Sequence, residues 1–71
     1  MISKKLAEEL YTENLDHLRR VVSAMEKDRA RIEDIVQEAF LKAFQAFEQL
    51  RDPSKFRAWI SRIAVNQCYE Y

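Results

Sequence analysis

The chain has 71 residues, which is enough for one small domain. Twelve basic residues balance twelve acidic ones, so the overall charge does not indicate a nucleic-acid-binding protein, and a polyanion site would need local clustering. The chain has no glycine, one proline and one cysteine, a composition that favours helix and excludes an internal disulfide framework.

The first predicted helix covers about residues 3–25, with Ser3 as its N-cap. Its apolar stripe comprises Leu6, Leu10, Leu18, Val21, Val22 and Met25. Asn14 occupies a position in this stripe and interrupts it. Residues 26–30 form a polar break, after which either Asp28 caps the next helix or the turn extends to Arg31.

The central predicted helix covers residues 31–50 and has two distinct faces. A broad apolar face, wide enough to pack against two neighbouring helices, contains Ile32, Ile35, Val36, Ala39, Phe40, Ala43, Ala46, Phe47 and Leu50. The opposite face contains Asp34, Gln37, Glu38, Leu41, Gln45 and Glu48. Leu41 is the one large apolar residue there. The pattern alone leaves two readings open, a solvated face or a docking surface for another protein.

Residues 51–55 separate the second helix from the third. Asp52 is the expected N-cap of a helix over residues 54–71, because Pro53 suits a first helical turn. The core stripe of that helix contains Phe56, Trp59, Ile60, Ile63 and Ala64, and its opposite face contains Ala58, Arg62, Val65 and Tyr69, with Asn66 at the edge. The sequence therefore predicts an all-α fold, a three-helix bundle that forms one domain over residues 1–71. Because the helical pattern continues to the last residue without a capping signal, we expect a fragment of a longer protein.

Cations and aromatic residues alternate around the start of the third helix. Arg51, Lys55, Arg57 and Arg62 face only Asp52 as a nearby acid, and Phe56 and Trp59 lie among them. Cations for phosphates and aromatics for bases are the arrangement of single-strand binders. The alternative is that the aromatics belong to the core and the cations are simply solvated.

No pattern indicates catalysis, a cofactor or a metal. Asp34 and Glu38 are four residues apart, but no histidine or glycine-rich loop accompanies them, so a solvated acidic face is the better interpretation. His17 is expected at the surface, and Cys68 has no companion at metal-ligand spacing. The chain shows no signal peptide and no membrane-spanning stretch. We therefore predict a cytoplasmic protein that is not an enzyme.

Two blocks in this sequence resemble region 2 of the bacterial sigma-70 family, specifically its extracytoplasmic-function subfamily. The first block consists of Asp34, Ile35, Val36, Gln37, Glu38 and Phe40, and the second of Phe56, Trp59, Ile60, Arg62, Ile63, Ala64 and Asn66. The resemblance is sharpest over residues 32–67. It implies a domain that docks on the clamp helices of the beta-prime subunit of RNA polymerase core. It also implies recognition and melting of the minus-ten promoter element through its non-template strand.

The resemblance assigns roles to particular residues. It implies that the helix with Asp34, Gln37 and Glu38 faces the polymerase, and the outward pattern adds Leu41 and Gln45. For the DNA site it implies the loop before the last helix and the start of that helix. The predicted DNA-binding residues are Arg51, Lys55, Phe56, Arg57, Arg62 and Asn66. Asn66 would offer a donor and an acceptor to an extruded base.

The chain departs from the family pattern in its last residues. The family usually continues with more basic residues on the last helix, whereas here Glu70 adds an acid, and the helix-turn-helix domain that reads the minus-thirty-five element is absent. The alternative function is a helical interaction module that binds polymerase or an anti-sigma factor without DNA contact. An anti-sigma factor is an expected partner under either reading.

Overall fold

The computed structural model describes residues 2–70, which form three α-helices and two short 3₁₀ turns. The first helix, α1 (Lys4–Ser23), begins at the predicted cap, because the Ser3 hydroxyl oxygen accepts a hydrogen bond from the Leu6 amide at 3.1 Å. It ends two residues before the predicted Met25. The Ser3 cap is therefore confirmed, and the end of the helix was placed slightly too far along the chain.

Two acidic side chains organise the turn that follows. The Glu26 carboxylate accepts hydrogen bonds from the Lys27 and Asp28 amides, and Asp28 accepts from the Ala30 and Arg31 amides. Asp28 is therefore the N-cap of α2 (Arg29–Gln45), the first of the two alternatives that the sequence left open.

The central helix is shorter than the predicted residues 31–50. It starts two residues earlier, ends at Gln45, and gives way to the 3₁₀ turn η1 (Phe47–Gln49). The tighter turn leaves Phe47 and Leu50 packed against the core. Over so few residues the apolar spacing does not distinguish an α-helix from a 3₁₀ turn, which explains the error.

The last helix begins as the Asp-Pro pair indicates. Asp52 accepts a hydrogen bond from the Ser54 amide at 3.0 Å and caps the 3₁₀ turn η2 (Pro53–Lys55). This turn leads directly into α3 (Phe56–Glu70). The predicted end at Tyr71 lies outside the described residues.

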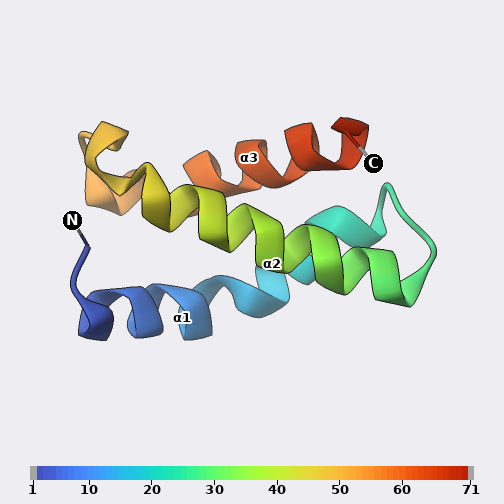
Figure 1. Ribbon diagram of the computed structural model, residues 1–71, viewed down its shortest axis with the longest axis horizontal. Coiled ribbons are helices and arrows are strands. Elements are labelled where there is room, and N and C mark those ends of the chain that lie inside the picture. The colour runs from blue at the N-terminus through green and yellow to red at the C-terminus, as the bar shows by residue number, and fades with distance from the viewer. Residues whose placement is uncertain (1, 71) are drawn as a thin grey trace.

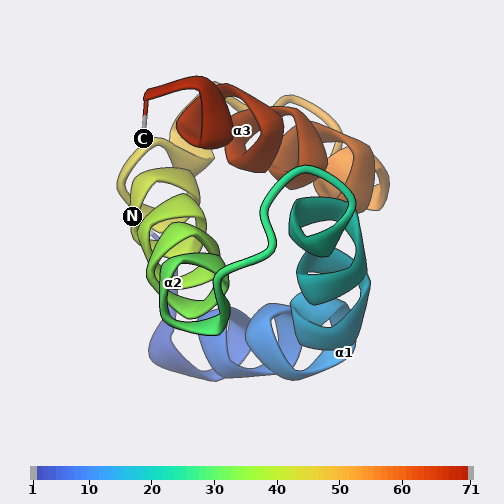
Figure 2. The ribbon, with the colours of Figure 1, turned by 90° about the vertical axis from the view of Figure 1, so that its right-hand side faces the viewer.

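The three helices form an up-down-up bundle. In Figure 1, α1 and α3 run in one direction and α2 runs in the opposite direction, while Figure 2 shows the three helices arranged around a common centre, each next to the other two. The molecule is 32 Å long and 19 by 17 Å in cross-section. The predicted all-α three-helix bundle is confirmed.

The centre is filled by one continuous apolar core. Its buried members are Leu18, Val22, Ile35, Val36, Ala39, Phe40, Ala43, Phe56, Ile60 and Ala64. Five of these ten described residues come from α2, so the predicted apolar face of the central helix is confirmed there. Trp59 and Ile63, which the pattern placed in the core stripe of the last helix, are partly buried at its margin.

A row of aromatic rings connects the three helices. Tyr11 of α1 lies 4.7 Å from Phe40 of α2, Phe40 lies 5.8 Å from Phe44, and Phe44 lies 6.2 Å from Phe56 of α3, all measured between ring centroids. Phe56 then meets the edge of Trp59 at 6.0 Å. Phe44 was not assigned to the apolar face, because it falls at the border of that face, yet it links α2 to α3.

Phe40→Ala is expected to lower the free energy of unfolding by about 3–5 kcal/mol, because it removes a buried ring from the middle of this row. Leu41→Ala is the matched control. Its side chain is 51% exposed, so the change should stay within about 0.5 kcal/mol. Chemical denaturation followed by circular dichroism measures both. Equal stability of the two variants would contradict the assigned core.

Candidate functional site

The outward side of α2 presents a polar surface with one apolar residue at its centre. We call this the α2 outer face, and it consists of Asp34, Gln37, Glu38, Leu41 and Gln45. Glu38 is half-buried, and the other four side chains are exposed. Leu41 is 51% exposed, so the structure places it on the surface as the pattern predicted. An apolar group surrounded by polar ones is typical of the centre of a small protein interface.

Gln37 is held in place by the neighbouring helix. Its side-chain nitrogen donates a hydrogen bond to the Tyr11 hydroxyl oxygen at 2.8 Å, and the Tyr11 ring rests against Phe40. An amide group makes up to four hydrogen bonds, so Gln37 keeps capacity for a partner. The contact with α1 fixes its position on the α2 outer face.

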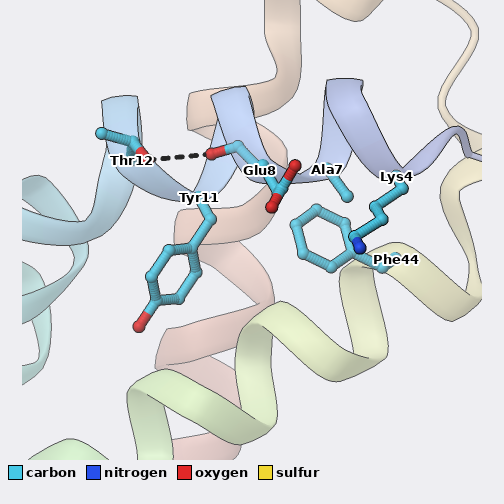
Figure 3. Close-up of a pocket in the computed structure, with 6 residues that line it drawn as sticks. All are labelled: Lys4, Ala7, Glu8, Tyr11, Thr12 and Phe44. Atoms are coloured by element: carbon cyan, nitrogen blue, oxygen red, sulfur yellow. Dashed lines mark hydrogen bonds between the residues drawn. The ribbon is translucent and has the colours of Figure 1, made fainter.

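A shallow groove of about 400 Å³ lies between α1 and α2, next to this contact (Figure 3). It is lined by Lys4, Ala7, Glu8, Tyr11, Thr12 and Phe44. Thr12 donates its hydroxyl proton to the Glu8 carbonyl oxygen, so that group is satisfied within the helix. The Tyr11 and Phe44 rings form the apolar part of the groove.

A second depression lies at the start of α3, and we call it the α3 pocket. Its volume is about 220 Å³, and it is lined by Leu50, Lys55, Ala58, Trp59 and Arg62. Asn66 is exposed one helical turn beyond Arg62, and Arg51 is exposed at the start of the loop. Two cations and an indole ring thus surround one hollow, a combination suited to a phosphate backbone and a stacked base.

Phe56 was predicted to contact DNA, and the structure places it in the core. Only 2% of Phe56 is exposed, and its ring lies nearly parallel to that of Phe44, at an interplanar angle of 16°. Other side chains surround the Phe56 ring, so neither of its faces is free to stack on a base. Its contribution to any DNA site is structural.

Arg57 is exposed, but its guanidinium group forms hydrogen bonds with residues of α1. Its Nε donates to the Asn14 Oδ1 at 2.9 Å, and its Nη2 donates to the Glu13 carbonyl oxygen at 2.8 Å. The structure therefore brings Lys55 and Arg62 together at the α3 pocket, with Arg51 at the start of the preceding loop, but directs the head group of Arg57 elsewhere.

Two polar residues buried between helices were not identified from the sequence. Asn14 is 5% exposed and Gln67 is 7% exposed. The Gln67 oxygen accepts a hydrogen bond from the Lys42 ammonium group, which also lies 3.2 Å from Glu70. For Asn14 a signal did exist, the interruption of the apolar stripe of α1. For Gln67 none did, since its partner lies 25 positions earlier.

Cys68 is the only cysteine of the chain and is partly buried. Burial raises the pKa of the Cys68 thiol, with a smaller contribution from Glu26, so the sulfur is a weaker nucleophile than an exposed cysteine. Among residues 2–70, no cluster of His, Cys, Asp and Glu is placed to hold a metal ion. None of the described helices is long and apolar enough to cross a membrane.

Comparison with known proteins agrees with the geometry. The family model for sigma-70 region 2 matches residues 10–71. Over 40 residues the chain is 48% identical to the ECF RNA polymerase sigma-E factors of Escherichia coli K12 and Haemophilus influenzae, and 45% identical to that of Salmonella typhimurium LT2. That segment is 56% of this chain and 21% of each relative. No solved structure matches.

The structure defines a small all-α bundle, and the matching family model is that of region 2 of the sigma-70 factors. Because the family model covers most of the chain, the chain belongs to the sigma-70 family as a region 2 domain. The matched relatives are several times longer than the shared segment. Everything that concerns a whole sigma factor therefore enters below as a proposal.

His17 provides a test of the geometry around Arg57. Partial burial lowers the pKa of the imidazole below its ordinary 6.5, and the positive charges of Arg57 and Arg20 lower it further. An NMR titration should give a midpoint below 6.5, and Arg57→Ala should move it upward. Because the unfolded chain takes up this proton at higher pH, the contribution of His17 to stability falls as the pH drops through 6.5. A midpoint that Arg57→Ala leaves unchanged would contradict the arrangement.

Proposed function

We propose that this domain docks on the beta-prime clamp helices of RNA polymerase core through the α2 outer face. We also propose that it recognises and melts the minus-ten element by holding a base of the non-template strand at the α3 pocket. The observation that carries the proposal is the presence of two different exposed surfaces on neighbouring helices. One is polar with a central leucine, and the other is cationic with an aromatic wall.

The α2 outer face supports the protein contact. Leu41 supplies a small apolar anchor, and Asp34, Glu38 and Gln45 supply a polar rim. Binding energy in such surfaces is concentrated in a few central side chains that become fully buried. The bond between Gln37 and Tyr11 keeps a polar group next to Leu41 in a fixed position, which reduces the entropy lost on association.

The α3 pocket supports contact with a single strand rather than a duplex. Reading a duplex with a helix needs a strongly basic face, and the exposed side of α3 carries Arg62 and Asn66 with the acid Glu70 one turn further on. One extruded base needs less. Lys55, Arg62 and the nearby Arg51 suit its phosphates, Trp59 offers an apolar wall, and Asn66 offers both a donor and an acceptor.

The second candidate function is a module that binds polymerase or an anti-sigma factor without touching DNA. The balanced net charge favours it, since nothing draws the whole domain to a polyanion. Both candidates use the α2 outer face, and they differ only in the role of the α3 pocket. In either case the proposed site of action is the cytoplasm, and the role is that of an initiation factor and not of an enzyme.

Leu41→Asp should abolish capture of the beta-prime coiled coil and leave the melting temperature within a few degrees of the parent, because Leu41 is exposed. Leu6→Asp is the matched control, since it makes the same change at a leucine of α1 that is 36% exposed and lies outside the α2 outer face. Capture by Leu41→Asp equal to that by the parent would remove the interface assignment.

Asn66→Ala and Lys55→Ala should separate base recognition from phosphate contact. With roughly three phosphate contacts, binding of a minus-ten non-template single strand should show a log–log salt slope near about −2. Lys55→Ala should make the slope shallower by about 0.7 and keep the base preference, while Asn66→Ala should relax the preference and keep the slope.

Fluorescence anisotropy with single-strand and duplex oligonucleotides measures both properties. Lys27→Ala, at an exposed cation in the turn between α1 and α2, is the control. Tighter binding of duplex than of single strand would contradict the base-extrusion mode and leave the second candidate.

A further inference from the structure

Arg57 and Asn14 form the most specific polar contact between α1 and α3, and we call it the Arg57–Asn14 clasp. The guanidinium group makes two hydrogen bonds at 2.9 and 2.8 Å, one to the Asn14 side chain and one to the Glu13 carbonyl oxygen. Two donors of one planar group directed at two acceptors fix orientation as well as distance. On the α3 side, Ser61 donates a hydrogen bond to the Arg57 carbonyl oxygen.

The burial of Asn14 shows that the clasp is part of the packing between α1 and α3 at the edge of the core. It is 5% exposed at a position where the stripe of α1 otherwise carries apolar side chains. Burying an amide is unfavourable unless its polar atoms are satisfied. Here the nitrogen donates to the Leu10 carbonyl oxygen at 2.8 Å and the oxygen accepts from Arg57, so both ends are used.

The direction of Arg57 excludes it from the α3 pocket. With about 100° between successive residues of a helix, Trp59, Arg62 and Asn66 fall within about 60° of one another. On the same count Arg57 lies at least about 140° from each of them. Its head group therefore meets α1 on one flank of α3 while the pocket opens on another.

We propose that Arg57 is a positioning residue, whose clasp to Asn14 and Glu13 sets the first turn of α3 so that Lys55 and Trp59 hold the shape of the α3 pocket. The inference rests on the proposed DNA function of that pocket. Lys55 and Trp59 each lie two residues from Arg57 in the chain, so rotation or fraying of this turn displaces them directly. The far end of α3 is held separately by Lys42 through Gln67 and Glu70.

The test compares Arg57→Ala, Asn14→Ala, the double variant that combines these two, Asn14→Asp and Arg20→Ala in the intact chain. Asn14→Asp keeps an acceptor oxygen for the guanidinium group but loses the donor to the Leu10 carbonyl oxygen. Arg20→Ala removes an exposed arginine of α1 outside the clasp. Two properties are measured, both below the unfolding transition of every variant. One is the affinity and salt slope for the non-template single strand, and the other is the NMR order parameters of the backbone amides of residues 54–58 in the free domain.

Arg57→Ala and Asn14→Ala are expected to weaken single-strand binding by about fivefold with an unchanged salt slope, and to lower the order parameters of residues 54–58. The double variant should lose no more than either single variant, because both break the same clasp. Arg20→Ala should retain the order parameters and base preference of the parent, and Asn14→Asp, which keeps the acceptor for Arg57, should retain more of both than Asn14→Ala.

The proposal is overturned if Arg57→Ala makes the salt slope shallower by about 0.7 while Asn14→Ala binds like the parent, since Arg57 would then contact a phosphate. Failure of the parent to bind single strands is a different result, because it contradicts the DNA function. In that case the order parameters alone decide, and unchanged values in both Arg57→Ala and Asn14→Ala reject the positioning role.

Discussion

Burial of the α2 stripe between two neighbours is the constraint on which the rest of this domain depends. A chain of 71 residues buries only about 60% of its unfolded surface, so its central helix must contribute to the core on two sides. Five buried residues of α2 do this. The opposite side of α2 is exposed to solvent, and helical periodicity alone places Leu41 on that side. The same packing places Phe44 against Phe56 and thereby sets where α3 begins, so the direction of the α2 outer face and the position of the α3 pocket both follow from one buried contact surface.

The features that could be predicted from the sequence are those with local causes. Ser3, Asp28 and Asp52 act as caps through side-chain contacts to amides two or three positions away, and each is visible as a residue type at the right distance from an apolar pattern. The exposure of Leu41 follows from helical periodicity, which needs no knowledge of the neighbours. The family resemblance rested on two blocks whose order and spacing were readable directly, and the match over residues 10–71 confirms it.

Most of the features that the sequence pattern did not reveal depend on which residues meet across the bundle. Arg57 looked like a DNA-binding cation because its neighbours in the chain are cations, but its acceptors are 43 and 44 positions earlier. The pattern suggested that the Phe56 ring stacks on a base, but in the structure this ring fills part of the core. The end of α2 was placed too late because an α-helix and a 3₁₀ turn share their apolar spacing over a few residues. Composition could suggest a cationic, aromatic site, but only the fold separates Lys55, Trp59 and Arg62, which line a pocket, from Arg57, which bonds to α1, and Phe56, which is buried in the core.

The zero net charge of the domain limits how strongly the α3 pocket can bind DNA on its own. A neutral domain has no long-range attraction for DNA, and about three phosphate contacts with one pocketed base give only weak binding. Weak binding suffices when a second contact supplies proximity, because docking through the α2 outer face would raise the local concentration of promoter DNA at the α3 pocket without any new contact to DNA. Under the proposed function, the isolated domain would then ignore DNA at large and engage it only next to polymerase. That arrangement works only if the pocket is formed before DNA arrives, since a weak site cannot also supply the free energy to order itself. A fixed first turn of α3 is therefore what the proposed function requires of a neutral domain. Under the proposal above, the hydrogen bonds that Arg57 donates to the Asn14 side chain and the Glu13 carbonyl oxygen of α1 supply it without adding charge to the surface.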